Sequence, residues 1–247
     1  MTTKLEAPAQ EPRNVDGGGT ASLAGVSRAF GSLRALDGVD LEVGAGEIVA
    51  VVGPSGCGKT TLLELVCGLQ RPDAGRVRAD PAVLMPQRDN LLPWLRAIDN
   101  AALAVRLAGA SRQQARARAH PLFAAFGLEG FERARPHELS GGMRQRVAFL
   151  RTLLSGKPVL CLDEPFASLD ALTRREMQEW LAQALRREPR TVLLVTHDVE
   201  EAATLAHRVL VMSPRPGRVV AELPVPATRT PAEVLAVRER ALEALRR

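Results

Sequence analysis

The sequence predicts an α/β fold with a parallel β-sheet, and three observations lead to that prediction. A strand, a glycine-rich loop and a helix follow one another within residues 47–67. Short apolar runs that are typical of buried strands recur along the chain, and after Val159 they alternate with helical patterns. The chain has 247 residues, of which 46% are hydrophobic, so it can bury a full core as one large domain or as a domain with a sizeable insertion.

The N-terminal part of the chain changes character near Ala21. The first twenty residues contain two prolines and a run of three glycines, a composition typical of a disordered tail. Residues 21–247 are expected to form a single domain. Within it, the alternation of apolar and polar residues over 39–43 predicts a strand, and residues 44–46 predict a turn. The apolar run Ile48–Val52 predicts the buried strand that leads into the glycine loop.

The glycine loop fits the phosphate-binding pattern G-x-x-x-x-G-K-[ST]. Its glycines allow successive amide N–H groups to point at phosphates, and the N-terminus of the following helix adds a positive field. Lys59 supplies a charge for the outer phosphates, Thr60 a hydroxyl for a magnesium ion, and Thr61 a donor for a nearer phosphate. The chain is therefore expected to bind ATP with Mg²⁺. The residues of the loop are Gly53, Pro54, Ser55, Gly56, Cys57, Gly58, Lys59 and Thr60.

The remaining elements follow from the periodicity of apolar residues. Between about Leu95 and Leu154 the strand pattern gives way to alanine-rich and arginine-rich segments with helical spacing, which predicts a helical insertion. Further strands are predicted at residues 82–85, 159–162, 191–196 and 208–212, and helices at residues 59–67, 97–107, 112–126, 143–154, 172–187, 199–206 and 231–246.

Two acidic residues follow the strand predicted at residues 159–162. The carboxyl end of a parallel strand is where open α/β sheets bind ligands. Asp163 is placed to hold a magnesium ion through water, and Glu164 is placed to orient an attacking water as a general base. The sequence therefore indicates ATP hydrolysis in addition to ATP binding.

A further set of motifs resembles that of ABC-type ATPases. The segment LSGGMRQR at residues 139–146 is similar to the signature motif of that family. In the family's order, the chain also has a lone glutamine, Gln87, then the Walker B end at residues 163–165, a D-loop at residues 168–170 and a switch histidine, His197. The resemblance covers nearly the whole domain.

The resemblance implies the fold and the roles of single residues. The fold would be an ABC-type ATPase with a mixed sheet at the phosphate loop, an N-terminal antiparallel β subdomain and an inserted α-helical subdomain at about residues 95–154. Gln87 would reach the magnesium ion or the attacking water, and His197 would contact the terminal phosphate. Phe30 matches the aromatic residue that stacks on adenine, although the family often has tyrosine there and this chain has none. The resemblance also implies that Asp170, in the D-loop, is a nucleotide-binding residue.

The signature motif implies that two chains pair. In this family Ser140 and the amides of Gly141 and Gly142 bind the terminal phosphate that the opposite subunit holds. One chain has one phosphate loop and one signature motif, so two copies are expected to pack head to tail around two ATP molecules. Hydrolysis would then remove the γ-phosphate contacts and release the closed pair.

The segment MPQRDNLLPW at residues 85–94 is similar to that of importers of the nitrate, sulfonate and taurine type, a branch that also takes up pyrimidine precursors of thiamine. The resemblance implies a motor subunit on the cytoplasmic face of the cell membrane, with a separate permease and, indirectly, a solute-binding protein as partners. Leu91, Leu92 and Trp94 either offer an apolar seat to a permease helix or pack inside the helical insertion.

Two functions other than import are compatible with the ABC-type motifs: a DNA-associated ATPase and an exporter ATPase. The net charge of +5 and the pI near 9.8 suit a DNA-associated ABC ATPase. However, the arginines are scattered among acidic residues, the three cysteines form no C-x-x-C pair, and the 80 residues from Lys59 to Leu139 are too few for a long coiled coil. No nucleic acid is therefore expected as a partner. An exporter ATPase with separate membrane subunits has the same chemistry, and the segment at residues 85–94 favours import over it.

Overall fold

The structure, a computed structural model, describes residues 19–167 and 169–246. Most of the tail predicted at residues 1–20 lies outside this range, and so does Ser168 of the predicted D-loop. The last two residues of that tail are described: Gly19 is buried, and the N–H of Thr20 donates to Oδ2 of Asp80 at 2.8 Å.

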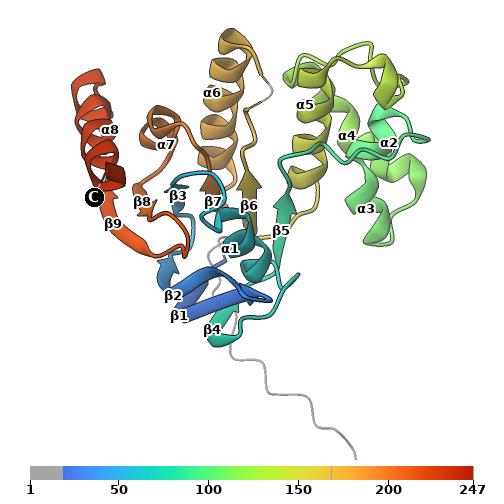
Figure 1. Cartoon of the computed structure of the whole chain (residues 1–247). Helices are drawn as coiled ribbons and strands as arrows, with labels where there is room; N and C mark the ends of the chain where they lie inside the picture. The colour runs from blue at the N-terminus through green and yellow to red at the C-terminus, as the bar shows by residue number, and fades with distance from the viewer. Residues whose placement is uncertain (1–18, 168, 247) are drawn as a thin grey trace, which may run out of the picture.

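Two β-sheets organise the molecule (Figure 1). The larger one is mixed and has the strand order β5-β6-β7-β3-β8-β9, in which only β9 runs antiparallel to its neighbour. Its strands are β3 (Ile48–Val52), β5 (Ala82–Met85), β6 (Val159–Asp163), β7 (Thr191–Val195), β8 (Arg208–Met212) and β9 (Val219–Pro224). The smaller sheet is antiparallel, with the order β2-β1-β4, and consists of β1 (Ala21–Phe30), β2 (Leu33–Val43) and β4 (Ala74–Ala79).

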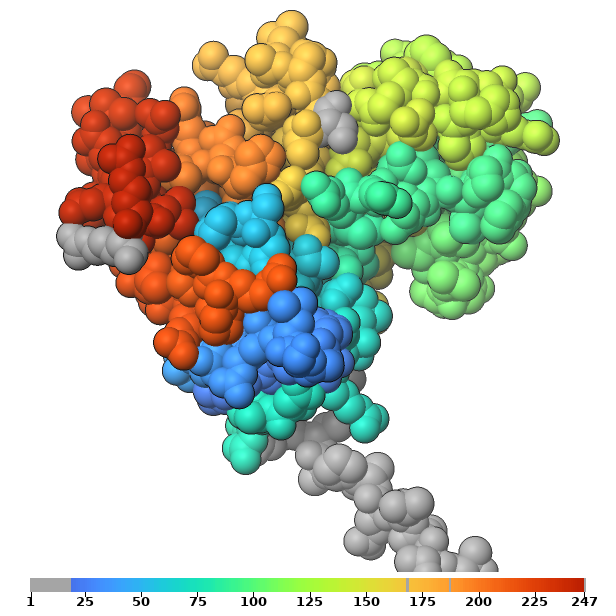
Figure 2. Space-filling view, in the orientation of Figure 1, coloured from blue at the N-terminus to red at the C-terminus, as the bar shows by residue number. Residues whose placement is uncertain are grey.

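The helices divide into three groups around these sheets. Helix α1 (Lys59–Val66) contacts strands of both sheets and lies between them in Figure 1. The helical insertion forms a lobe at one side of the mixed sheet, coloured green to yellow-green in Figure 2. It contains α2 (Ala97–Ala101), α3 (Leu103–Leu107), α4 (Arg112–Ala125), the 3₁₀ helix η1 (Pro136–Glu138) and α5 (Gly141–Leu153). The last group is α6 (Ala171–Arg187), α7 (Val199–Leu205) and α8 (Pro231–Arg246).

Alternating residues of the mixed sheet face two different cores, as the pleat of a strand requires. In β3, Ala50 and Val52 belong to the core under α5 to α8, whereas Val49 and Val51 belong to the core shared with α1 and the antiparallel sheet. Both faces of the strand are therefore covered. This explains why the sequence of β3 is continuously apolar rather than alternating.

The predicted fold class is confirmed: a mixed sheet, an N-terminal antiparallel sheet and a helical insertion are all present. The segment predicted as one helix at residues 97–107 is divided at Ala102, whose φ of −79° and ψ of 0° separate α2 from α3.

Three strands, β1, β4 and β9, were not predicted. In β1, register shifts between Leu23 and Ala29 break the two-residue alternation, and in β4 only Val77 is partly buried. Among the residues that the structure describes, every helix is too short or too polar to span a lipid bilayer.

Candidate active site

The phosphate loop opens onto a pocket of about 330 Å³. Its walls come from the β1–β2 hairpin, the loop with the start of α1, and the chain just beyond β5 and β6. The residues of the predicted site that line it are Phe30, Ser55, Gly56, Gly58, Lys59, Thr60, Thr61, Gln87, Asp163 and Glu164. The structure thus brings together residues that are more than 130 positions apart in the chain.

The loop curls around the amine of Lys59. Its Nζ donates to the carbonyl oxygen of Gly53 at 2.8 Å and to that of Pro54 at 3.0 Å. Gly58 has a φ of 101°, and a Cβ there would lie 2.8 Å from the carbonyl oxygen of Ala35. A side chain is therefore excluded at this point of the loop.

Three predicted loop residues, Gly53, Pro54 and Cys57, are not among those that line the pocket. Cys57 is 1% exposed, and its Sγ lies 3.9 Å from Nζ of Lys59. Because the thiol points into the protein, only the backbone of Cys57 is available to a nucleotide.

Asp163 ends β6 beside the start of α1. The hydroxyl of Thr60 donates to Oδ2 of Asp163 at 2.7 Å. Burial raises the pKa of this carboxyl, and the hydrogen bond from Thr60 opposes that effect. The pair places a hydroxyl and a carboxylate oxygen next to the phosphate loop.

Glu164 is held in a strained backbone conformation. Its φ is 48°, in the left-handed region that non-glycine residues rarely adopt. The strain is offset in part by its N–H, which donates to the carbonyl oxygen of Val195 at 2.8 Å and so extends the pairing of β6 with β7. Strained residues of this kind cluster at functional sites.

Residues from three neighbouring strand ends meet at the carboxylate of Glu164. Nε2 of Gln87, just after β5, donates to its Oε2 at 3.0 Å. Nδ1 of His197, just after β7, lies 3.4 Å from the same oxygen. The side chain of Glu164 is 18% exposed and that of His197 is 65% exposed. A carboxylate oriented by an amide and an imidazole suits a general base.

The signature residues and Asp170 lie outside this pocket. Ser140 caps α5 by accepting from the N–H of Met143 at 3.2 Å, and Gly141 and Gly142 open that helix. Oδ1 of Asp170 accepts from the N–H of Thr173 at 3.0 Å and caps α6, and this hydrogen bond lowers the pKa of Asp170. Neither helix N-terminus lines the pocket beside the phosphate loop.

The donor set around Asp163 fits a magnesium ion. Thr60, Gln87 and Asp163 offer oxygen ligands, which Mg²⁺ prefers, and Mg²⁺ commonly uses one or two carboxylates together with substrate phosphates. Across the described residues, no cluster of three or more His, Cys, Asp or Glu is arranged to hold a metal by itself.

The pocket-lining residues Leu33, Ala35 and Arg215 were missed by the sequence analysis, and so was Arg28, which contacts Phe30. Arg215, in the turn between β8 and β9, lines the pocket. The guanidinium carbon of Arg28 lies 4.9 Å from the ring centroid of Phe30, the aromatic residue expected to contact adenine. The only sequence signal near Arg215 is a Pro-Arg-Pro-Gly turn, and it does not say which part of the fold the turn reaches.

The fold, the phosphate loop and the two acidic residues at the end of β6 define an ATP-hydrolysing cassette. Residues 36–167 match the model of a family described as ABC transporter, and the chain therefore belongs to that family. It is 48% identical to the taurine import ATP-binding protein of Burkholderia pseudomallei over 77% of both chains. It is 43% identical to the protein of the same name from Rhizobium johnstonii, over 86% of this chain and 85% of that one.

A solved structure supports the same assignment. The chain resembles a dimeric ATP-binding cassette in a post-hydrolysis state bound to ADP and Pi, with a TM-score of 0.77 and 29% sequence identity. The match covers 84% of this chain and 99% of that one. The resemblance to ABC-type ATPases of the nitrate, sulfonate and taurine branch is confirmed by these matches.

Proposed function

We propose that this chain is the ATP-hydrolysing motor of an importer whose solute is a small sulfonate such as taurine. The convergence of Gln87, Glu164 and His197 beside the phosphate loop carries the proposal, because it supplies a base and its orienting groups next to a nucleotide pocket. The similarity to taurine import ATP-binding proteins supports the direction and the solute class.

Within one chain, the loop amides and Lys59 bind the phosphates of ATP, and Thr61 donates to a nearer phosphate oxygen. Phe30, which is 43% exposed at the pocket, offers its ring to the adenine. A magnesium ion held by Thr60, Asp163 and Gln87 would neutralise charge on the outer phosphates. Glu164 takes a proton from the attacking water, while Gln87 and His197 hold its carboxylate in place.

The signature motif serves a second copy of the chain. Ser140, Gly141 and Gly142 form a helix N-terminus, which binds phosphate well, yet they do not line the pocket of their own chain. Two copies packed head to tail would bring each signature motif, together with Asp170, to the nucleotide of the other copy. The dimeric state of the similar solved cassette supports this arrangement.

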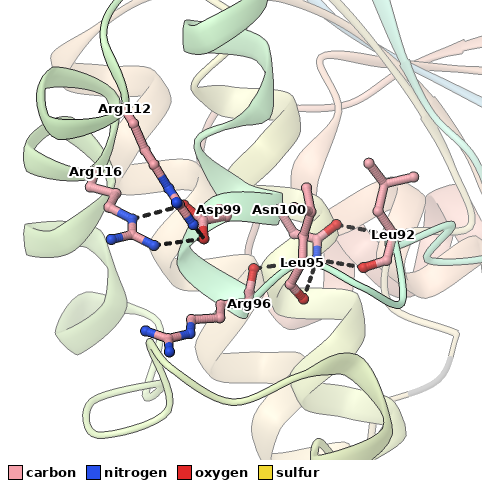
Figure 3. A network of polar contacts seen from close by, with 7 residues as sticks. All are labelled: Leu92, Leu95, Arg96, Asp99, Asn100, Arg112 and Arg116. Carbon is pink, nitrogen blue, oxygen red and sulfur yellow. Dashed lines mark hydrogen bonds and ion pairs between the residues drawn. The ribbon is translucent and has the colours of Figure 1, made fainter.

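The segment after Gln87 is a candidate seat for the permease. Leu91 is buried, whereas Trp94 is 68% exposed, so the two residues split between core and surface. Asn100 fixes the segment: its side chain accepts from the N–H of Leu92 at 2.8 Å and donates to the carbonyl oxygens of Leu92, Leu95 and Arg96 (Figure 3). A rigid loop with an exposed indole is suited to pack against an apolar helix.

We place the chain on the cytoplasmic face of the cell membrane, where it would reach the permease and, through it, a solute-binding protein. We also infer that residues 21–247 act as one domain in which the insertion at about residues 95–154 moves with nucleotide state. Gln87 links the two parts, since it lies just before the insertion and contacts Glu164.

Steady-state ATPase assays test the catalytic part of the proposal. Glu164→Gln keeps the shape of the side chain but loses the base, so turnover should fall at least about 100-fold while ATP affinity stays within about three-fold. Lys59→Ala should instead weaken ATP binding itself. Wild-type turnover by Glu164→Gln would show that another group is the base.

Affinity capture from native cells tests the partners and the solute class. Tagged Glu164→Gln protein, purified with ATP, should bring a multi-span permease and a solute-binding protein, and that binding protein should bind taurine or a related sulfonate in calorimetry. Recovery of DNA or soluble repair factors without a membrane partner would contradict the importer. A captured binding protein that does not bind sulfonates would contradict the proposed solute class but not the importer.

A further inference from the structure

The turn between β8 and β9 joins the phosphate loop to the antiparallel sheet. The N–H of Gly217 donates to the carbonyl oxygen of Ala35 at 2.9 Å, and its own carbonyl oxygen accepts from the N–H of Asp37 at 3.1 Å. A Cβ on Gly217 would lie 2.0 Å from the carbonyl oxygen of Cys57, so the turn packs directly against the phosphate loop. Ser213 closes the turn, because its Oγ accepts from the N–H of Arg218 at 3.0 Å.

This anchored turn carries Arg215 to the nucleotide pocket. Nε of Arg215 donates to the carbonyl oxygen of Gly56 at 2.9 Å. A Cβ built on Gly56 would lie 2.6 Å from Nη2 of Arg215, so the guanidinium group lies against the loop itself. Within the described part of the chain, Nη1 and Nη2 make no hydrogen bond or ion pair, and the side chain lines the pocket.

The charges that line the pocket show why the unpaired Nη1 and Nη2 groups of Arg215 matter for phosphate binding. Four charged side chains line it: Lys59 and Arg215 against Asp163 and Glu164. The amine of Lys59 donates to two loop carbonyls and lies near Sγ of Cys57, so the Nη groups of Arg215 add donors to those that Lys59 and the loop amides can offer a phosphate. A guanidinium group offers a planar fork of N–H donors, which matches the oxygens of a phosphate.

We propose that Arg215 is a further nucleotide-binding residue, which contacts the phosphate chain of ATP from the rim of the phosphate loop. The inference rests on the proposed function, since it takes ATP as the occupant of the pocket. Nε holds the guanidinium on the loop, and the Nη groups donate to phosphate oxygens. The β8–β9 turn thereby adds a ligand that the phosphate-loop motif does not contain.

The test is the affinity of four proteins for ATP and ADP, measured by calorimetry in the Glu164→Gln background so that turnover does not interfere. The variants are Arg215→Ala, Arg215→Lys and, as the matched control, Arg218→Ala. Arg218 lies in the same turn and pairs with Asp37, but it does not line the pocket. A lost charge-assisted hydrogen bond at an exposed site should raise the Kd of Arg215→Ala for ATP roughly ten-fold.

Two further readouts separate a phosphate contact from support of the loop's shape. Arg215→Lys retains the charge but not the planar fork, so it should lose less ATP affinity than Arg215→Ala does, and the loss in Arg215→Ala should shrink as salt is raised. Arg218→Ala should bind like the parent. The proposal is overturned if Arg215→Ala binds like Arg218→Ala, or if alanine and lysine lose affinity equally with no dependence on salt. Failure of the parent itself to bind ATP would contradict the proposed function as well.

Discussion

Glu201 is a buried carboxyl group at the start of α7, close to His197. It is 6% exposed, and its Oε1 has no partner among the described residues. Burial raises the pKa of Glu201 to about 7, and the nearby charge of Asp198 adds to this effect, while Thr196 and Arg174 oppose it. With Glu164 and His197 it lines a small cavity.

The stability of the protein should therefore depend on pH through Glu201. The folded protein holds this proton up to about pH 7, whereas an unfolded glutamate releases it near 4.5. The folded state binds the proton more tightly, so stability falls as the pH rises through this window. Glu201→Gln cannot ionise, so its melting temperature should exceed that of the wild type at about pH 8, and the difference should shrink at about pH 5. An equal difference at both pH values in thermal unfolding would contradict the assignment.

The residues of the proposed hydrolysis site differ in how well their positions could be predicted from the sequence. Four of them lie at or just after the end of a strand, so the sequence could predict that they meet at one edge of the sheet: Gln87, Asp163, Glu164 and His197. The position of Arg215 could not be predicted in this way, because the sequence of a turn between two strands does not fix the direction of the turn. Tertiary packing places the side chain of Arg215 against Gly56.

At the scale of elements, one buried carboxylate joins the helices of the insertion. Asp99 of α2 is 1% exposed and accepts two hydrogen bonds each from Arg112 and Arg116 of α4 (Figure 3). Burial alone would raise the pKa of Asp99, but the hydrogen bonds and charges of Arg116 and Arg112 lower it well below its usual range. Its contribution to stability is therefore present above about pH 4 and is lost as the pH falls below that value.

Replacing this carboxylate should destabilise the insertion. Asp99→Asn removes the charge that both arginines face, and unfolding in urea should show a loss of about 2 kcal/mol, less than for a fully buried pair because the side chain of Arg112 is 56% exposed. Arg175→Ala is the control, since the side chains of Arg175 and Glu179 are 80% and 62% exposed and their pairing should contribute about 0–0.5 kcal/mol. If both variants unfolded at the same urea concentration, the Asp99 network would contribute no more to the free energy of unfolding than an exposed ion pair does.

The strands that apolar runs predicted most clearly are those buried on both faces, whereas the part of β2 at residues 39–43 was predicted from its alternation of buried and exposed residues. Strands β3, β6, β7 and β8 are buried on both faces and read as continuous apolar runs. Strand β4 carries arginines at two of its six positions and lies mostly exposed, so its sequence resembles a loop. The break between α2 and α3 leaves no signal, because alanine at residue 102 fits a helix as well as a turn.

At the scale of the whole molecule, the proposed ATP-hydrolysing site is incomplete in a single chain. The phosphate loop, Asp163 and Glu164 share one pocket, while the signature residues cap α5 outside it. The pairing of two copies of the chain is inferred from the resemblance to ABC-type ATPases and from the separation of the signature residues from the pocket.

The most direct measurement is the mass of Glu164→Gln protein in gel filtration with light scattering, with and without ATP and Mg²⁺. We predict a monomer without nucleotide and a dimer with ATP, because the intact γ-phosphate holds two copies together. Ser140→Asp in the same background keeps a good helix cap but places a negative charge against the partner's phosphate, so it should remain monomeric when ATP is added. Because ATP binding and dimerisation are linked, its apparent affinity for ATP should be weaker than that of the parent. A dimer that tolerates Ser140→Asp, or a Ser140→Asp monomer that binds ATP as tightly as the dimeric parent, would contradict a site shared between two copies.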